Sequence, residues 1–169
     1  LDIERIEAAE IQRVPLWTDR RIERGPFDII GDVHGCFDEL SELFDRLGYR
    51  PNDVGVLAHP EGRRAIFVGD LVDRGPNSVG VLNTARTMVA AGTALCVPGN
   101  HDEKLLKKFR GKDVRITHGL AETLQQIDAL APEDKTRFVA ESTEFLDGLV
   151  SHFVLDDGRL VVAHAGMKA

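Results

Sequence analysis

The chain has 169 residues and a formal net charge of −7, and 43% of its residues are hydrophobic while 29% are charged. This length and balance predict one globular domain, and the net charge argues against a surface built as a whole to bind nucleic acid. No apolar run reaches the roughly 18 residues of a membrane span, and a signal-peptide pattern is absent, so we expect no membrane contact. Cys36 and Cys96 are far apart and each lies beside a motif, which indicates free, small apolar side chains in a cytoplasmic protein.

The first part of the chain alternates strand patterns with helix patterns. Residues 1–24 are expected to be a linker or N-terminal extension in which Leu16 and Trp17 dock onto the domain. A hairpin across the turn His59-Pro60-Glu61-Gly62 is predicted from two apolar runs that flank it. The elements expected up to residue 97 are a strand at 27–30, a helix at 37–47 ending at Gly48, strands at 54–57 and 64–68, a helix opened by Pro76 and ended by Gly92, and a strand at 94–97.

Helical patterns continue from there until a final hairpin. Helices are expected at 101–110, from an N-cap at Thr117 to Leu130, and from Pro132 to near Gly148. Residues 152–155 and 159–163 flank Asp156-Asp157-Gly158, which favours a β-hairpin. The alternation of strands and helices predicts an α/β fold, whose ligands bind beyond the C-terminal ends of the strands.

Four polar blocks each follow an apolar run, and together they predict a two-metal site. The blocks are Asp32-Val33-His34-Gly35, Asp70-Leu71-Val72-Asp73-Arg74-Gly75, Gly99-Asn100-His101-Asp102 and Ala163-His164-Ala165-Gly166. Asp32 and His34 are two residues apart and can face one metal, and a carboxylate such as Asp70 can bridge two. Asn100 and His164 would supply an oxygen and a nitrogen to the second metal. This mixed donor set suits manganese, iron or zinc better than calcium, and such sites most often hydrolyse phosphate esters.

The remaining polar residues of these blocks predict acid catalysis and phosphate binding. His101 is adjacent to Asn100, so the two side chains diverge and His101 can protonate the leaving oxygen. Asp73 could hold the His101 imidazole, and the forked cation of Arg74 suits a phosphoryl group. We expect His59, His118 and His152 to be structural, because they lie in a turn, at a helix start and at a strand start.

A basic stretch follows the third block and has two interpretations. It could form a solvated helix face, or it could contact a phosphate backbone beside the active site. Its members are Lys104, Lys107, Lys108, Arg110, Lys112 and Arg115.

The four blocks resemble those of the calcineurin-like metallophosphoesterases, in particular the phosphoprotein-phosphatase branch. The resemblance covers residues 26–166 and implies a β-sandwich flanked by helices, with the metallophosphoesterase domain at 25–169. It implies two divalent metal ions, most often Mn²⁺, with Fe, Zn or Ni as alternatives. Asp32, His34 and Asp70 would hold metal one, and Asp70, Asn100 and His164 metal two. A metal-activated hydroxide would attack phosphorus with His101 and Asp73 as the acid pair, while Arg74 and Asn100 would contact substrate.

A narrower resemblance is to the central phosphatase domain of bacterial polynucleotide kinase-phosphatase. It rests on segments 15–21, 25–30, 117–124 and 151–155. It implies hydrolysis of phosphates at polynucleotide 2′ or 3′ ends in RNA repair, including cyclic phosphates. The implied partners are nucleic-acid ends, RNA rather than DNA, and kinase and ligase domains of the same parent chain. That family carries a further histidine ligand downstream, and the sequence stops at Ala169. We therefore expect a domain that lacks its C-terminal part and has weak activity or none alone.

Three alternatives to this function stay open. The first is a protein serine/threonine phosphatase. The second is a dinucleoside tetraphosphate hydrolase, a class whose members typically lack an aspartate equivalent to Asp73. The third is a non-catalytic metal-binding scaffold, against which the intact His101, Asp73 and Arg74 argue, because a scaffold needs none of them.

Overall fold

Two three-stranded sheets, a two-stranded ribbon and five α-helices make up residues 17–166, the part of the chain that the computed structural model describes. The elements in chain order are β1 (Asp19–Arg20), β2 (Phe27–Ile30), α2 (Phe37–Leu47), β3 (Arg50–Pro51), β4 (Leu57–Ala58), β5 (Arg64–Phe67), α3 (Ser78–Ala90), β6 (Ala94–Cys96), α4 (Asn100–Phe109), α5 (Leu120–Asp128), α6 (Pro132–Asp147), β7 (His152–Leu155), the 3₁₀ turn η1 (Asp156–Gly158) and β8 (Leu160–Ala163).

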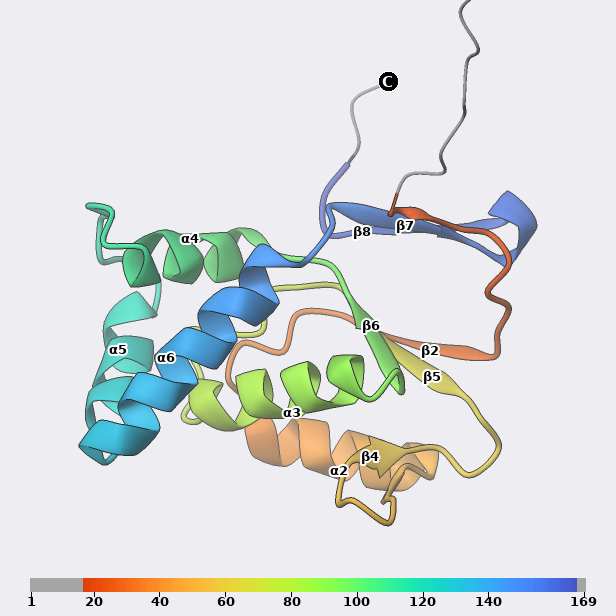
Figure 1. Ribbon diagram of the computed structural model, residues 1–169, viewed down its shortest axis with the longest axis horizontal. Coiled ribbons are helices and arrows are strands. Elements are labelled where there is room, and N and C mark those ends of the chain that lie inside the picture. Colours follow the sequence, from red (N-terminus) through yellow and green to blue (C-terminus); the bar gives the residue numbers. More distant parts are fainter. Residues whose placement is uncertain (1–16, 167–169) are drawn as a thin grey trace, which may run out of the picture.

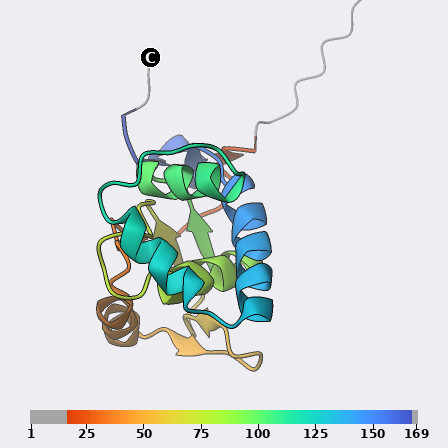
Figure 2. The ribbon, with the colours of Figure 1, turned by 90° about the vertical axis from the view of Figure 1, so that its left-hand side faces the viewer.

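The central layer is a parallel sheet of order β2-β5-β6. Its middle strand, β5, is apolar on both faces: Ala65 and Phe67 belong to the core shared with the helices, and Ile66 belongs to a second core. That second core is completed by Phe153, Leu155 and Val162 of the other sheet, whose order is β1-β7-β8. Figures 1 and 2 show the result, with α2 and α3 on one face of the parallel sheet and the second sheet on the opposite face. The α/β sandwich flanked by helices that the sequence predicts is confirmed.

Local signals place most helix ends where the sequence predicts them. Gly48 ends α2 in the left-handed conformation, at φ 93°. The Asn77 side chain caps α3 by accepting a hydrogen bond from the Gly80 N–H at 2.7 Å. α5 differs, because Gly119 and not Thr117 precedes its first residue and the helix ends at Asp128. None of the helices within residues 17–166 is long and apolar enough to cross a membrane.

The predicted hairpin between residues 54–57 and 64–68 is wrong. The strand at 57–58 pairs antiparallel with residues 50–51, whereas β5 pairs in parallel with β2 and β6. The turn at His59–Gly62 does form, with the Gly62 N–H donating to the His59 carbonyl at 2.9 Å. The two strands separate after it, because a run that is apolar on both faces is stabilised at the centre of a sheet, where both faces are covered.

Part of the segment predicted as a linker lies in the second sheet. Asp19 and Arg20 pair in parallel with Val154 and Leu155 of β7, and the Arg20 guanidinium lies 5.2 Å from the centre of the Phe153 ring. Trp17 is 85% exposed, so its predicted docking is wrong, and Leu16 lies outside the described residues. Backbone pairing and the Arg20 stacking contact therefore attach this segment, and the tryptophan does not.

Candidate active site

The four polar blocks meet at one end of the two sheets. Asp32 follows β2, Asp70 follows β5, Asn100 begins α4, which is the next element after β6, and His164 follows β8. Strands β2, β5 and β6 are parallel and in register, so their C-terminal ends lie side by side. The structure thus brings together the residues that the sequence singles out, at the edge where ligands of α/β sheets bind.

Backbone strain is concentrated in two of these blocks. His34, Asp70, Asp73 and Arg74 have φ values of 48°, 49°, 72° and 67°, in the left-handed region that L-residues rarely occupy. Such conformations cost roughly 1–3 kcal/mol each and cluster where side chains must be aimed at a ligand. His118, Asp156 and Asp157 share this conformation, so the loops after β2 and β5 hold four of the seven such non-glycine residues in the described part of the chain.

Asp70 lies between two imidazoles. His34 Nε2 is 3.7 Å from Asp70 Oδ2, and His164 Nε2 is 3.6 Å from Asp70 Oδ1. The opposite ring nitrogens are both occupied: Nδ1 of His34 lies 2.9 Å from the Val72 carbonyl, and Nδ1 of His164 lies 2.7 Å from the Val68 carbonyl. Since those Nδ1–H groups donate to carbonyls, each Nε2 presents a lone pair toward Asp70, which is how metal-binding histidines are oriented.

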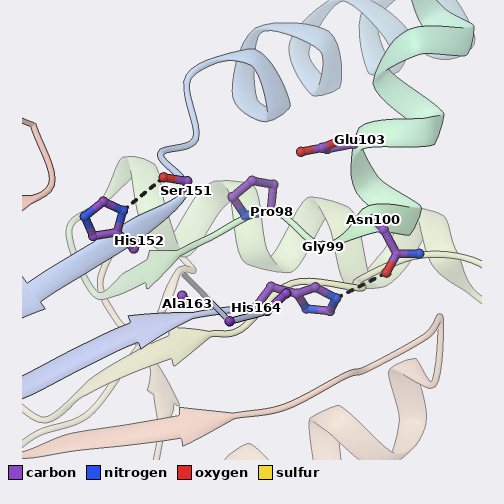
Figure 3. A pocket seen from close by; sticks show the side chains of 10 residues that line it. Pro98, Gly99, Asn100, Glu103, Ser151, His152, Ala163 and His164 are labelled. Carbon is purple, nitrogen blue, oxygen red and sulfur yellow. Dashed lines mark hydrogen bonds between the residues drawn. The ribbon is translucent and has the colours of Figure 1, made fainter. Parts of the chain in front are cut away.

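The separations of the candidate donor atoms around Asp70 equal or slightly exceed those of atoms that share one cation. Asp32 Oδ2 lies 3.9 Å from His34 Nε2, and Asn100 Oδ1 lies 3.4 Å from His164 Nε2 (Figure 3). These separations are longer than ordinary hydrogen bonds, and two atoms that bind one ion at about 2.1 Å lie roughly 3–3.5 Å apart. The donor set of carboxylate, amide oxygen and imidazole suits divalent transition metals. Such ions, when bound, neutralise charge that develops on a phosphoryl group.

The candidate ligands group differently in the structure than in the two sets predicted from the sequence. One set of mutually close ligand atoms comes from Asp32, Asp70 and His164, and another from His34, Asp70 and His101. Asp32 therefore reaches toward both sides of Asp70, and His101 Nε2 lies 4.0 Å from Asp70 Oδ2. Asp70 is the residue that belongs to both sets.

His101 and Asp73 form a buried pair. His101 Nδ1 lies 2.7 Å from Asp73 Oδ2, and the two side chains are 6% and 0% exposed. Asp73 thereby fixes the imidazole so that its Nε2 faces the site. Arg74 Nη2 lies 3.5 Å from that Nε2. Arg74 itself is exposed and has room to turn toward a bound anion. This arrangement can hold a proton at Nε2 beside a guanidinium that binds phosphoryl oxygen.

Asp102 holds two of the loops together and was not predicted to do so. It is 1% exposed, and its two oxygens accept hydrogen bonds from the Leu71 and Gly99 N–H groups, each at 2.9 Å. Burial raises the pKa of Asp102 to about 7, while those N–H donors act in the opposite direction. Its position three residues after Gly99, the residue before α4, lets its carboxylate accept the Gly99 N–H, and an acidic residue at that helix position is a signal that could have identified it.

A pocket of about 500 Å³ lies beside Asn100 and His164 (Figure 3). Its lining residues are Pro98, Gly99, Asn100, Glu103, Ser151, His152, Ala163, His164, Ala165 and Gly166. His152 Nδ1 and Ser151 Oγ are 3.0 Å apart in its wall. His152 begins β7, but the antiparallel pairing places it opposite Ala163 at the end of β8. The sequence prediction of a purely structural role for His152 overlooks this pairing.

Two other histidines and the basic stretch make contacts of their own. The His59 ring is held in its turn, with Nε2 3.0 Å from the Leu47 carbonyl, and His118 lies in the loop before α5. In the basic stretch, Lys104 donates to Thr117, Lys107 pairs with Glu103, and Arg110 pairs with Asp147. These contacts favour a solvated, ion-paired helix face. Cys36 and Cys96 are free, and Cys96 is buried.

Comparisons with known proteins identify similar sequences and a similar structure. The chain is 44% identical over 143 residues to the bis(5′-nucleosyl)-tetraphosphatase PrpE [asymmetrical] of Anoxybacillus flavithermus, covering 84% of this chain and 58% of that protein. It is 38% identical to the protein of that name from Bacillus subtilis, over 85% of this chain and 58% of that one. A crystal structure assigned provisionally as a diadenosine tetraphosphatase matches with a TM-score of 0.56 and 27% identity, over 88% of this chain and 55% of that one.

These comparisons correct the narrower resemblance. The chain spans somewhat more than half the length of these curated relatives, and they are tetraphosphatases. The predicted likeness to polynucleotide kinase-phosphatase finds no support in them. The broader resemblance to the calcineurin-like metallophosphoesterases is supported, because the family model for calcineurin-like phosphoesterases matches residues 25–168. With the strand-end arrangement of its candidate metal ligands, this chain belongs to the calcineurin-like phosphoesterase family.

Proposed function

We propose that this chain hydrolyses phosphoanhydride bonds of dinucleoside polyphosphates. The observation that carries the proposal is the position of Asp70, whose two oxygens each face one imidazole nitrogen, with His101 and Arg74 beside them. The substrate class rests on the tetraphosphatase relatives. In this proposal two divalent ions, manganese first among them, would be held by Asp32, His34, Asp70, Asn100 and His164.

The protein's own side chains have distinct tasks in this reaction. Arg74 binds oxygens of the phosphoryl group under attack, and Asn100 contacts the substrate next to it. Water attacks phosphorus, the bond to the leaving oxygen breaks, and that oxygen can take the proton from His101 Nε2. Asp73 keeps the imidazole in place throughout, because its Oδ2 is 2.7 Å from His101 Nδ1.

The pocket beside Asn100 and His164 offers room for one end of such a substrate. Its volume of about 500 Å³ is within the range typical of ligand pockets. Glu103 can accept hydrogen bonds from sugar hydroxyls or a base amine, and Ser151 and His152 can donate or accept them. We therefore place one nucleoside group of the substrate against these three side chains.

A second candidate is the hydrolysis of phosphomonoesters at polynucleotide ends, and the buried His101–Asp73 pair favours it. A phosphate leaving group departs readily without a proton, whereas the alkoxide of a ribose needs a general acid. An intact acid pair is therefore more useful on a sugar phosphate than on an anhydride. In this candidate the RNA end and the kinase and ligase domains of a longer parent chain are the partners.

Kinetics with three substrates separate these functions. The experiment measures kcat/KM at saturating Mn²⁺ for diadenosine tetraphosphate, a 3′-phosphorylated oligoribonucleotide and a serine phosphopeptide. We expect diadenosine tetraphosphate to be preferred by about tenfold or more, a difference of about 1.4 kcal/mol in transition-state binding. A preference for the oligonucleotide would replace the first candidate with the second, and a preference for the phosphopeptide would exclude both.

Two variants test whether the measured hydrolysis depends on Asp70 and His101. Asp70→Asn should abolish hydrolysis of all three substrates, because an amide nitrogen replaces one of the two carboxylate oxygens and the negative charge is lost. His101→Ala should reduce hydrolysis of the oligonucleotide by about 10²–10⁴-fold and affect the tetraphosphate much less, because only the alkoxide needs the proton. Full activity of Asp70→Asn would refute the role given to Asp70. Absence of activity in the unmodified chain with every substrate and metal would favour the non-catalytic scaffold.

A further inference from the structure

Helix α5 supplies two polar side chains to the loop that carries Asp73 and Arg74. Thr123 and Gln126 are on the same face of the helix, one turn apart. Gln126 Oε1 accepts the Ser78 N–H at 2.6 Å, and Gln126 Nε2 donates to the Gly75 carbonyl at 3.1 Å. Gln126 therefore holds the backbone of the loop. Thr123 contacts a different group, which is the carboxylate of the acid pair.

Thr123 binds the oxygen of Asp73 that His101 leaves free. Its Oγ1 donates to Asp73 Oδ1 at 2.8 Å, while Asp73 Oδ2 lies 2.7 Å from His101 Nδ1. The same Oγ1 accepts the Asp73 N–H at 3.1 Å and lies 3.0 Å from Ser78 Oγ. The side chains of Thr123, Asp73 and Ser78 are each at most 1% exposed. Both oxygens of a buried carboxylate are thus fixed, one by the imidazole and one by a hydroxyl 50 residues away in the sequence.

We propose that Thr123 is a positioning residue for general-acid catalysis: its hydroxyl fixes the plane of the Asp73 carboxylate and thereby the direction of His101 Nε2. A carboxylate held at one oxygen only can rotate about its last side-chain bond, and Asp73 already has a strained backbone with φ 72°. Rotation would turn or release the imidazole, so its proton would no longer point at the leaving oxygen. This inference rests on the proposed acid role of His101.

Dependence on the leaving group tests this role. The experiment measures kcat at saturating Mn²⁺ for phosphomonoesters whose leaving groups range from dinitrophenol, which needs no proton, to an alkyl alcohol, which does. Thr123→Val has nearly the same shape and removes the hydroxyl. We expect kcat to fall by about 10–100-fold on the alkyl ester, as for a misplaced catalytic group, and to change little on the dinitrophenyl ester. Thr123→Ser retains the hydroxyl and should restore the original dependence.

Gln126→Leu is the matched control. It loosens the same loop from the same helix without touching Asp73. It should therefore slow all esters by a similar factor, and the steeper dependence on leaving group should be specific to Thr123→Val. In a His101→Ala background, Thr123→Val should have no further effect, because residues that act through one another are not additive.

The results separate the positioning role of Thr123 from the acid role of His101. If His101→Ala does not steepen the leaving-group dependence, the acid role fails, and the inference fails with it. If His101→Ala steepens the dependence and Thr123→Val slows all esters equally, only the positioning role is overturned. If Thr123→Val does not unfold cooperatively, the comparison is made with Thr123→Ser and Thr123→Ala, and equal slopes for these two would also overturn it.

Discussion

Replacement of Gly99 by alanine should disrupt the metal-binding arrangement while the fold persists. Gly99 has φ −93° and ψ 172°, an extended conformation that any residue adopts, so alanine would cause no backbone strain. A Cβ at this position would lie 2.1 Å from Asp70 Oδ1 and 2.2 Å from Asp70 N. Ordinary contacts begin near 3.4 Å, so Asp70 or the Gly99 loop must move by more than 1 Å.

The magnitude follows from that displacement. A shift of about 1 Å in a catalytic constellation costs about 10²-fold in rate, and overpacking costs about 1–3 kcal/mol of the roughly 5–15 kcal/mol that stabilise a domain. We therefore expect kcat/KM to fall by about 100-fold or more and Mn²⁺ affinity by about 10–100-fold, because misplaced supporting groups weaken metal binding by that amount. Thermal unfolding of the metal-free protein should stay cooperative.

Calorimetric titration with Mn²⁺, hydrolysis kinetics and thermal unfolding in a chelator measure these three quantities. Gly148→Ala is the control, because Gly148 also has an ordinary backbone, with φ −78°, and its Cβ would make only normal contacts at 3.4 Å or more. Mn²⁺ affinity and activity of Gly99→Ala within about threefold of the unmodified protein, a difference of well under 1 kcal/mol, would refute the claim that close packing of Gly99 on Asp70 sets the site.

Three further predictions concern stability. Asn77→Ala removes the cap on the Gly80 N–H and should lower the unfolding free energy by about 1 kcal/mol, measured by urea denaturation; an unchanged midpoint would contradict the capping role. Hydrogen bonds from Arg63 hold the pKa of Asp28 below its usual value, so the ionised carboxylate stabilises the fold above about pH 4 and less at lower pH. The loss of unfolding free energy caused by Asp28→Asn should thus be smaller at pH 3 than at pH 7. A larger loss at pH 3 would contradict the lowered pKa of Asp28. Ser142 Oγ is buried without a partner in the described residues, so Ser142→Ala should leave stability unchanged or raise it by up to about 1 kcal/mol, and a loss of more than that would indicate a hidden partner.

The sequence indicated which polar side chains would lie close together where the signal was local. Asp32, Asp70 and Asn100 each follow a strand of the parallel sheet, whose strand ends lie side by side. His164 follows β8 of the second sheet, which packs against the first. Asp73 follows Asp70 closely in the same loop, so its pairing with His101 was also within reach of sequence reasoning.

Residues that act across the fold carry no such signal. Thr123 and Gln126 lie on a helix between ordinary neighbours, and nothing near them in the sequence indicates that they hold the loop of Asp73. His152 begins a strand, yet antiparallel pairing with β8 moves it to the wall of the pocket beside His164. Only the tertiary structure could identify these three.

The sequence by itself determined the helices, the hairpin of β7 and β8, and the chemical types of the candidate ligands. Each depends on caps, turns and apolar periods within a few residues. The tertiary structure decided which strands pair: β4 pairs with β3, β5 lies between β2 and β6, and β1 pairs with β7. The physical reason is that strand pairing depends on which surfaces remain to be buried once the whole chain has folded, and no short segment contains that information.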